Sequence, residues 1–274
     1  MSSLTVRKLD VDLSKGFGRR WLGGDAYRSQ WFNALSMTFP IGEQMFIDSL
    51  RAVPAERIED PVLRAELKDF IGQEATHRHV HIQYNAELER QNLAFVTEQR
   101  ILWRVRRVAR LDARSQVAIT CAFEHYTAML ADGILRHPEW IMDAEPALRR
   151  LWEWHAVEEL EHKAVAFDVY RAAGGGYWRR VLWFVHVSLV FWFDNFIQTA
   201  HNLGRDGALW RPGTWWSAAR MWFGRRGLAW HMAGPVLQYF SPSFHPWRHD
   251  NRALVDTWLE RNRDAYRTIR SSAP

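Results

Sequence analysis

Four long runs with a helical period of hydrophobic and polar residues dominate the first two thirds of the chain. They cover residues 25–53 with an interruption at Pro40, residues 62–91, residues 97–136 with a bend near Asp112, and residues 145–173. Pro and Gly mark several of their ends, and none shows the two-residue alternation of a half-buried strand. The pattern predicts an all-α fold whose central part, residues 25–173, is a four-helix bundle.

The segments on either side of this bundle differ from it. Residues 1–24 hold turn signals but no long periodic run, so we expect an N-terminal extension there. Residues 174–274 predict additional C-terminal helices that pack on the bundle to form one domain. The 13-residue uncharged run from Val181 to Phe193 is too short to span a bilayer, which needs about 20 apolar residues, and predicts a buried helix. A final amphipathic helix is expected over residues 251–268.

Composition narrows the class of protein. The chain is 47% hydrophobic and 24% charged, which excludes wholesale disorder. Its one cysteine, Cys121, excludes a disulfide framework and a thiolate-only metal site. No apolar targeting segment follows Met1, so we expect a cytoplasmic protein.

The C-terminal extension is rich in Trp and Arg. Nine of the 16 Trp lie between Trp178 and Trp247, and residues 171–231 hold eight Arg against two Asp. A packed cap over the bundle is the favoured interpretation, and a peripheral membrane contact is the alternative, because both side chains suit the headgroup zone. The apolar content is too high for a nucleic-acid groove, so no nucleic-acid partner is expected. A homodimer stays open.

Each predicted bundle helix carries a glutamate in an apolar neighbourhood, and two of them carry a histidine three residues later. The residues are Glu43, Glu74 with His77, Glu124, and Glu159 with His162. Residues i and i+3 share a helix face, so each Glu-x-x-His directs a carboxylate and an imidazole to one point. Four carboxylates and two imidazoles inside a bundle are the ligand set of a carboxylate-bridged di-iron or di-manganese centre. Without metal, four buried glutamates would be severely unfavourable.

Several side chains near these ligands are candidates to orient them. They are His81, Tyr84, Tyr126, Glu158 and Asp194. For both tyrosines an ordinary core position is the stronger expectation. No glycine-rich phosphate loop and no serine nucleophile elbow accompany the cluster.

Short motifs throughout the chain resemble the ferritin-like di-iron carboxylate superfamily. They resemble more narrowly a bacterial family labelled predicted metal-dependent hydrolases, over about residues 30 to 265. The motifs are Phe39-Pro40-x-Gly42-Glu43, Gln73-Glu74-x-x-His77, His81-x-x-Tyr84-Asn85, Glu124-His125-Tyr126-Thr127-Ala128, Trp154-His155-x-x-Glu158-Glu159-x-Glu161-His162-Lys163 and Phe244-His245-Pro246-Trp247. This resemblance implies a ferritin-like bundle.

The fourth motif helix adds one more histidine. His155, Glu159 and His162 share a face, and His-x-x-x-Glu-x-x-His resembles the p-aminobenzoate N-oxygenase type of di-iron enzyme. That resemblance implies His155 as a seventh metal ligand. His81, one turn after His77, competes for this role.

Three functions follow from this site. The leading one is an enzyme with two iron ions, or a mixed Mn/Fe pair, that activates dioxygen with an external reductant and oxidises an apolar or aromatic small molecule. The first alternative is a binuclear metal-dependent hydrolase, in which two metals activate water. The second alternative is a metal-binding protein without catalysis.

Overall fold

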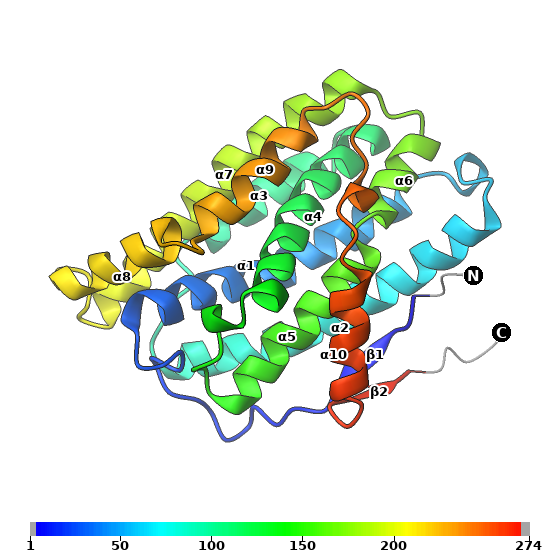
Figure 1. Cartoon of the computed structure of the whole chain (residues 1–274). Coiled ribbons are helices and arrows are strands. Elements are labelled where there is room, and N and C mark those ends of the chain that lie inside the picture. Colours follow the sequence, from blue (N-terminus) through cyan, green and yellow to red (C-terminus); the bar gives the residue numbers. More distant parts are fainter. Residues whose placement is uncertain (1–3, 270–274) are drawn as a thin grey trace.

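Four helices form the centre of the fold, and each begins where the sequence supplies a start signal. They are α1 (Ala26–Arg51), α2 (Pro61–Arg90), α4 (Ala113–Arg136) and α5 (Pro146–His162) in a computed structural model that describes residues 4–269 (Figure 1). The carboxylates of Asp25, Asp60 and Asp112 accept backbone N–H bonds at the starts of α1, α2 and α4. Pro146 opens α5, where its missing N–H is not needed. The all-α prediction is confirmed.

Three predicted helix boundaries are wrong. Helix α1 continues through Pro40, because its packing on α2 and α7 outweighs the one hydrogen bond that proline removes. The third run is two helices, α3 (Glu98–Val108) and α4, since Asp112 caps a new helix rather than bending an old one. The fourth run likewise ends at His162, and α6 (Val165–Ala172) follows.

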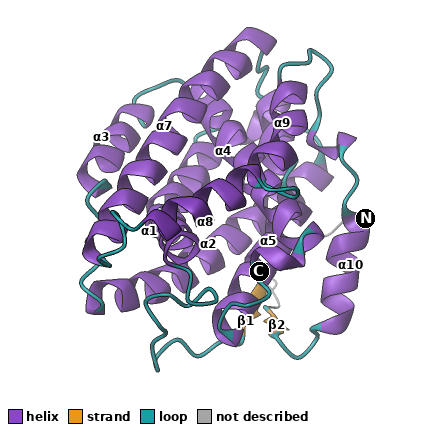
Figure 2. Cartoon of the chain, turned by 60° about the vertical axis from the view of Figure 1, so that its left-hand side comes forward, coloured by secondary structure: helices purple, strands orange, loops and turns teal. Residues whose placement is uncertain are grey.

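The helices pack in layers around the bundle interior. Helix α1 packs on α2, and α4 packs on α5. Helix α7 (Tyr177–Arg205) lies over α1 and α4, with α3 against α1 and α9 (Leu228–Tyr239) against α4, while α8 (Pro212–Phe223) contacts α1 and α9 (Figure 2). Short 3-10 turns cover Ala55–Arg57, Pro138–Trp140 and Pro246–Arg248.

The two ends of the chain meet in a small sheet that the sequence did not predict. Strand β1 (Arg7–Leu9) pairs antiparallel with β2 (Tyr266–Thr268), with Lys8 opposite Arg267. The expected last helix therefore ends earlier, as α10 (Arg252–Arg261). Three-residue strands are too short to show a period, and their partners lie at opposite ends of the sequence. The ends of the two predicted extensions, residues 1–3 and 270–274, lie outside the described residues.

Helix α7 differs from the short buried helix that we expected. It has 29 residues, and within the described part of the chain it alone has the length and mean hydropathy of a membrane-crossing helix. Only 33% of its most apolar window is buried. The length of the 13-residue uncharged run is smaller than the length of the helix, because the helix continues past Phe193 through Asp194 to Arg205.

Candidate metal centre

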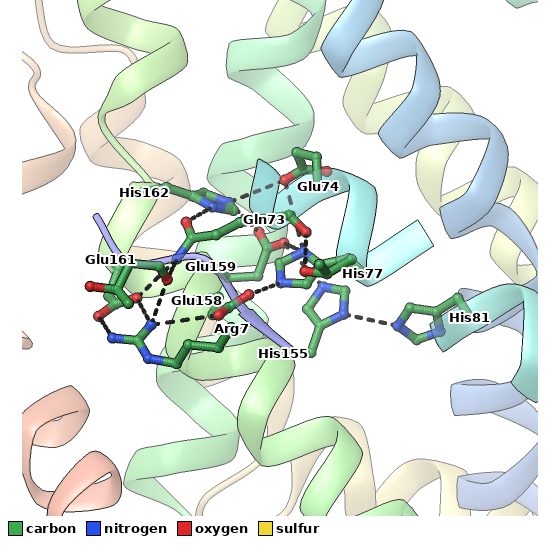
Figure 3. Close-up of polar contacts among 12 residues, drawn as sticks. Arg7, Gln73, Glu74, His77, His81, His155, Glu158, Glu159, Glu161 and His162 are labelled. Atoms are coloured by element: carbon green, nitrogen blue, oxygen red, sulfur yellow. Dashed lines mark hydrogen bonds and ion pairs between the residues drawn. The ribbon is translucent and has the colours of Figure 1, made fainter. Parts of the chain in front are cut away.

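The six residues of the predicted ligand set meet inside the bundle, between α1, α2, α4 and α5. The Nε2 atom of His162 lies 3.3 Å from Glu74 Oε1, 3.4 Å from Glu124 Oε2 and 3.6 Å from Glu159 Oε2. The Nδ1 atom of His77 lies 3.5 Å from Glu159 Oε1 and 3.9 Å from Glu74 Oε1 (Figure 3). Donor atoms that share one ion at about 2.1 Å lie about 3.0–3.4 Å apart, so these spacings are close to those of a metal site.

Glu43 completes the set from α1. One donor atom each from Glu43, Glu74 and His77 lie within 4.8 Å of one another. The same holds for Glu74, Glu159 and His162, and for His77, His155 and Glu159. Glu74 and Glu159 thus belong to groups around both His77 and His162.

The inward-facing atoms of this cluster have no hydrogen-bond partner among residues 4–269. They include both carboxylate oxygens of Glu43, Glu74 and Glu124, together with Glu159 Oε2, His77 Nδ1 and His162 Nε2. Each of these six side chains is buried. Unpaired buried polar atoms cost the folded state several kcal/mol, roughly 1–3 for each group. The donor set and its unpaired atoms therefore fit two divalent cations.

His77 is held by a carboxylate on its outer side. Its Nε2 donates to Glu158 Oε2 at 3.0 Å, and Arg7 Nη1 from β1 lies 3.5 Å from Glu158 Oε1. A ring nitrogen facing a carboxylate carries the proton, so the inner Nδ1 keeps its lone pair when the ring is neutral. Glu158 was predicted to orient a ligand, and the structure places it against His77.

His162 is held by an amide. Its Nδ1 donates to Gln73 Oε1 at 3.0 Å. The amide orientation follows from its other end, where Gln73 Nε2 donates to Thr5 O at 3.1 Å and to Glu161 Oε2 at 3.0 Å. Glu161 in turn accepts from Arg7 at 2.5 and 2.9 Å. When the ring is neutral, the lone pair of His162 Nε2 consequently faces the carboxylates of Glu74, Glu124 and Glu159.

His155 ends a chain of hydrogen bonds whose direction can be assigned. Asn85 Nδ2 donates to the Ser36 carbonyl at 2.9 Å, so Asn85 Oδ1 accepts from Ser36 Oγ at 2.8 Å. With its proton used, Ser36 Oγ accepts from His81 Nδ1 at 2.8 Å. His81 Nε2 then accepts from His155 Nδ1 at 2.9 Å.

This chain leaves a lone pair on His155 Nε2, which lies 3.0 Å from Glu159 Oε1. Burial and the nearby charge of His77 lower the pKa of His155 to about 4, and burial lowers the pKa of His81 well below its usual value. Both rings are therefore neutral near pH 7, and two acceptors face each other. A cation between His155 and Glu159 would relieve that repulsion. The direction of these hydrogen bonds thus gives His81 the role of fixing the orientation and tautomer of the His155 ring.

The carboxylates titrate abnormally because they are buried together. Burial raises the pKa of Glu43 and Glu74 well above the usual value, and with Glu159 nearby it raises the pKa of Glu124 to about 7. Burial also acts on Glu159, but the charge of His162 outweighs it and lowers the pKa of Glu159 well below its usual value. Burial opposes protonation of His77, yet Glu158 and Glu159 raise its pKa to about 10. Without a cation the four carboxylates cannot all ionise.

Three other predicted orienting residues bond elsewhere. Tyr84 donates to Asn33 Oδ1 at 2.6 Å, and Tyr126 donates to Ser188 Oγ at 2.7 Å. Asp194 forms ion pairs with Arg100 and Arg104 of α3. The structure gives these side chains no bond to the metal-ligand candidates, because their helix positions face α7, α3 or the α1–α2 contact.

Sequence reasoning missed Arg7 and Ser36 altogether. Arg7 comes from the N-terminal strand, and its contacts with α5 depend on a fold that no local pattern reveals. The role of Gln73 could have been inferred from the sequence, since it directly precedes the ligand candidate Glu74 on the same helix.

An apolar pocket leads from the surface to this cluster. Its cavity volume is about 100 Å³, and it lies between α1, α3, α4 and α7. Glu43, His155 and Glu159 line it, whereas Arg104 and the exposed His186 mark its outer part. Most of its wall is apolar and comes from Leu35, Phe39, Phe46, Val105, Phe123 and Phe191. A pocket with this apolar lining and a few polar groups at its inner end suits the apolar part of a small organic molecule.

Comparison with known proteins gives one match. The model of a family described as predicted metal-dependent hydrolase matches residues 5–250. No curated protein and no solved structure matches the chain. The matched range includes every residue of the cluster and the pocket.

Proposed function

Because the chain belongs to the family of predicted metal-dependent hydrolases, we propose that it is a two-metal hydrolase that acts on an apolar substrate. The observation that carries this proposal is the convergence of four carboxylates and three imidazoles whose inward atoms mostly lack protein partners. The apolar pocket that ends on three of these residues supports the substrate class. The ferritin-like relation that the motifs imply supports the same donor set.

The residues divide between two ion positions. Glu124, Glu74 and Glu159 surround His162, and Glu43, His155, Glu74 and Glu159 surround His77. Glu74 and Glu159 occur in both groups, so they are the candidates to bridge. Two bound divalent ions would supply Lewis acidity and lower the pKa of a water molecule toward neutrality.

The chain's own residues then have separate tasks. Glu43, His155 and Glu159 form the side of the cluster that faces the pocket, so substrate approaches there. The apolar wall, including Phe39 and Leu35, excludes bulk water and binds the apolar part of the substrate. Glu158 and Gln73, on the far side, fix the rings of His77 and His162.

Oxidation by dioxygen is the second candidate. It is favoured by the three imidazoles among four carboxylates, a mixed donor set that suits iron or manganese. Two iron ions, or a Mn/Fe pair, would supply electrons to dioxygen, and an external reductant would restore them. The apolar pocket serves this reaction equally well, since an oxidised substrate needs no charged binding group.

One assay separates the two candidates. The metal-loaded protein is incubated with p-nitrophenyl esters of short and long acyl chains without oxygen, and oxygen uptake is measured separately with reductant present. Hydrolysis predicts metal-dependent ester turnover that rises with chain length and is lost in Glu159→Gln. The control Glu153→Gln, six residues earlier on α5 and bonded to Arg149 and Trp258, should keep it. Substrate-dependent oxygen uptake with no anaerobic turnover would overturn hydrolysis and favour oxidation. If the protein shows neither ester turnover nor oxygen uptake, a metal-binding protein without catalysis is favoured.

A further inference from the structure

The outer face of α7 carries an uncovered apolar stripe. Trp178 and Leu189 are 77% and 69% exposed, and Leu182, Phe193 and Phe196 are each more than half exposed. Their spacing of three, four or seven residues puts them on one side of the helix. From Trp178 to Phe196 the stripe is about 27 Å long at about 1.5 Å per residue. This side of α7 has no covering element within the described residues.

Neighbouring segments extend the exposed apolar surface. Trp216 and Phe223 of α8, Trp230 and Leu237 of α9, and Trp210 between α7 and α8 are each more than half exposed. We call the stripe and these five residues the apolar face. Soluble monomers rarely expose a contiguous apolar patch of more than a few hundred Å², and a larger patch marks a protein or membrane interaction site.

The charges on the helices that carry or border the apolar face are mainly positive. Helices α3, α7, α8 and α9 contain eight arginines but only two acids, and neither acid is exposed: Asp194 is buried, and Glu98 is half-buried. Arg106 and Arg107 of α3, and Arg220 and Arg225 at α8, are exposed. A partner surface must therefore combine apolar material with negative charge.

We propose that the apolar face docks on the surface of an anionic lipid bilayer. Trp rings and Arg side chains suit the headgroup zone, and each basic residue near an anionic membrane adds about a fivefold gain in affinity. Helix α7 docks along its side rather than crossing the bilayer, because its inner face packs on α1 and α4. Buried Gln198 on that inner face also donates to the Ala94 carbonyl.

A second copy of the chain fits this face less well. A two-fold contact would place the same surface on both sides, so the exposed arginines of one copy would meet those of the other. No exposed acid on α3, α7, α8 or α9 could pair with them. Phosphate headgroups supply the missing negative charge.

Docking would also bring the pocket to the lipid. The outer lining of the pocket comes from α3 and α7, where Ile101 and Arg104 face His186 and Val190. On α7 the lining residues Val190 and Asp194 directly follow Leu189 and Phe193 of the stripe. An apolar substrate could then pass from the bilayer to the cluster without crossing water, a consequence that rests on the proposed function.

Vesicle flotation tests the docking. The full chain is mixed with neutral phosphatidylcholine vesicles and with vesicles containing phosphatidylglycerol, and the bound fraction is measured. We expect binding to the anionic vesicles that weakens with salt. The double variant Leu189→Glu/Phe193→Glu should bind at least about tenfold more weakly. The variant Arg220→Gln/Arg225→Gln should lose about 25-fold on anionic vesicles. The control Val62→Glu changes an apolar residue at the start of α2 that is 51% exposed, and it should bind as the wild type does.

Three results would overturn the proposal. They are no binding to either vesicle, equal binding to neutral and anionic vesicles, and a wild-type dimer that ignores vesicles and is split by the Leu189→Glu/Phe193→Glu change in light scattering. Helix content and melting temperature establish that each variant is folded. Glu74→Ala, changed in the metal cluster, should still bind vesicles, so failure of the docking and failure of the proposed function are distinguishable.

Discussion

Replacing Glu124 by Gln should stabilise the metal-free protein, although it removes a candidate metal ligand. The Glu124 carboxyl lies among three other carboxylates, and burial with the charge of Glu159 raises its pKa from 4.5 to about 7. At about 1.4 kcal/mol for each pKa unit, ionising this carboxyl costs the folded state about 3 kcal/mol. Glutamine has nearly the same shape and cannot ionise, so it avoids that cost.

The pH dependence fixes the sign of the effect. Between pH 4.5 and about 7 the folded protein keeps the Glu124 proton that the unfolded chain has lost. The folded state then binds more protons, so its stability falls as the pH rises through this window, and the loss is complete above it. The Glu124→Gln variant does not lose this stability, because glutamine cannot ionise. The difference between variant and wild type should be near zero at the acid end of the window and about 3 kcal/mol at about pH 8.

Urea denaturation with a chelator present, at about pH 5 and about pH 8, measures this difference. Glu56→Gln, an exposed surface change, is the matched control and should leave both stabilities unchanged. With saturating metal the wild type should be more stable than the Glu124→Gln variant, because the variant has lost a metal ligand. A Glu124→Gln protein that is no more stable than the wild type at the higher pH, or a gain that is equal at both pH values, would refute the reasoning.

Four further outcomes are expected. Glu74→Ala should abolish binding of at least one ion in metal analysis, because Glu74 belongs to the groups around both His77 and His162; unchanged content would count against a bridging role. Gln73→Leu should lower metal affinity about 10–100-fold with the fold intact, because His162 loses the acceptor that sets its tautomer, whereas exposed Gln83→Leu on the same helix should bind normally in a metal titration. His155→Ala should keep the fold and at least one ion but change turnover or oxygen uptake, and identical metal content and activity would remove His155 from the site. Gly133→Ala should lower the unfolding free energy by about 2 kcal/mol, since its Cβ would lie 2.1 Å from the Trp140 ring, while Gly213→Ala, with open space, should not alter thermal unfolding.

The sequence predicts the centre of this site well because its geometry is local. Two residues three apart on a helix must share a face, so Glu74 with His77 and Glu159 with His162 could be paired without a structure. The lone glutamates on α1 and α4 were recognisable because apolar residues surround them. The structure brings all six together, and it places His155 beside them.

The parts that depend on distant contacts were not predictable. Arg7 contacts Glu158 and Glu161 only because β1 pairs with β2 from the far end of the chain. The break at Asp112 was not predicted, because an aspartate that caps a new helix and an aspartate at a bend within one helix look alike in the sequence. The uncovered face of α7 was predicted to be buried, because an apolar run in the sequence does not show whether other helices or another apolar surface cover it.

The most direct test of the account is the number of metal ions per chain. The protein is purified without chelator, loaded separately with Fe(II), Mn(II) and Zn(II), desalted, and analysed by inductively coupled plasma mass spectrometry alongside Glu74→Ala and Glu153→Gln. The account predicts two ions per chain in the wild type and in Glu153→Gln, and at most one in Glu74→Ala. A wild-type protein that retains no ion, or the same metal content in all three proteins, would contradict the two-metal centre.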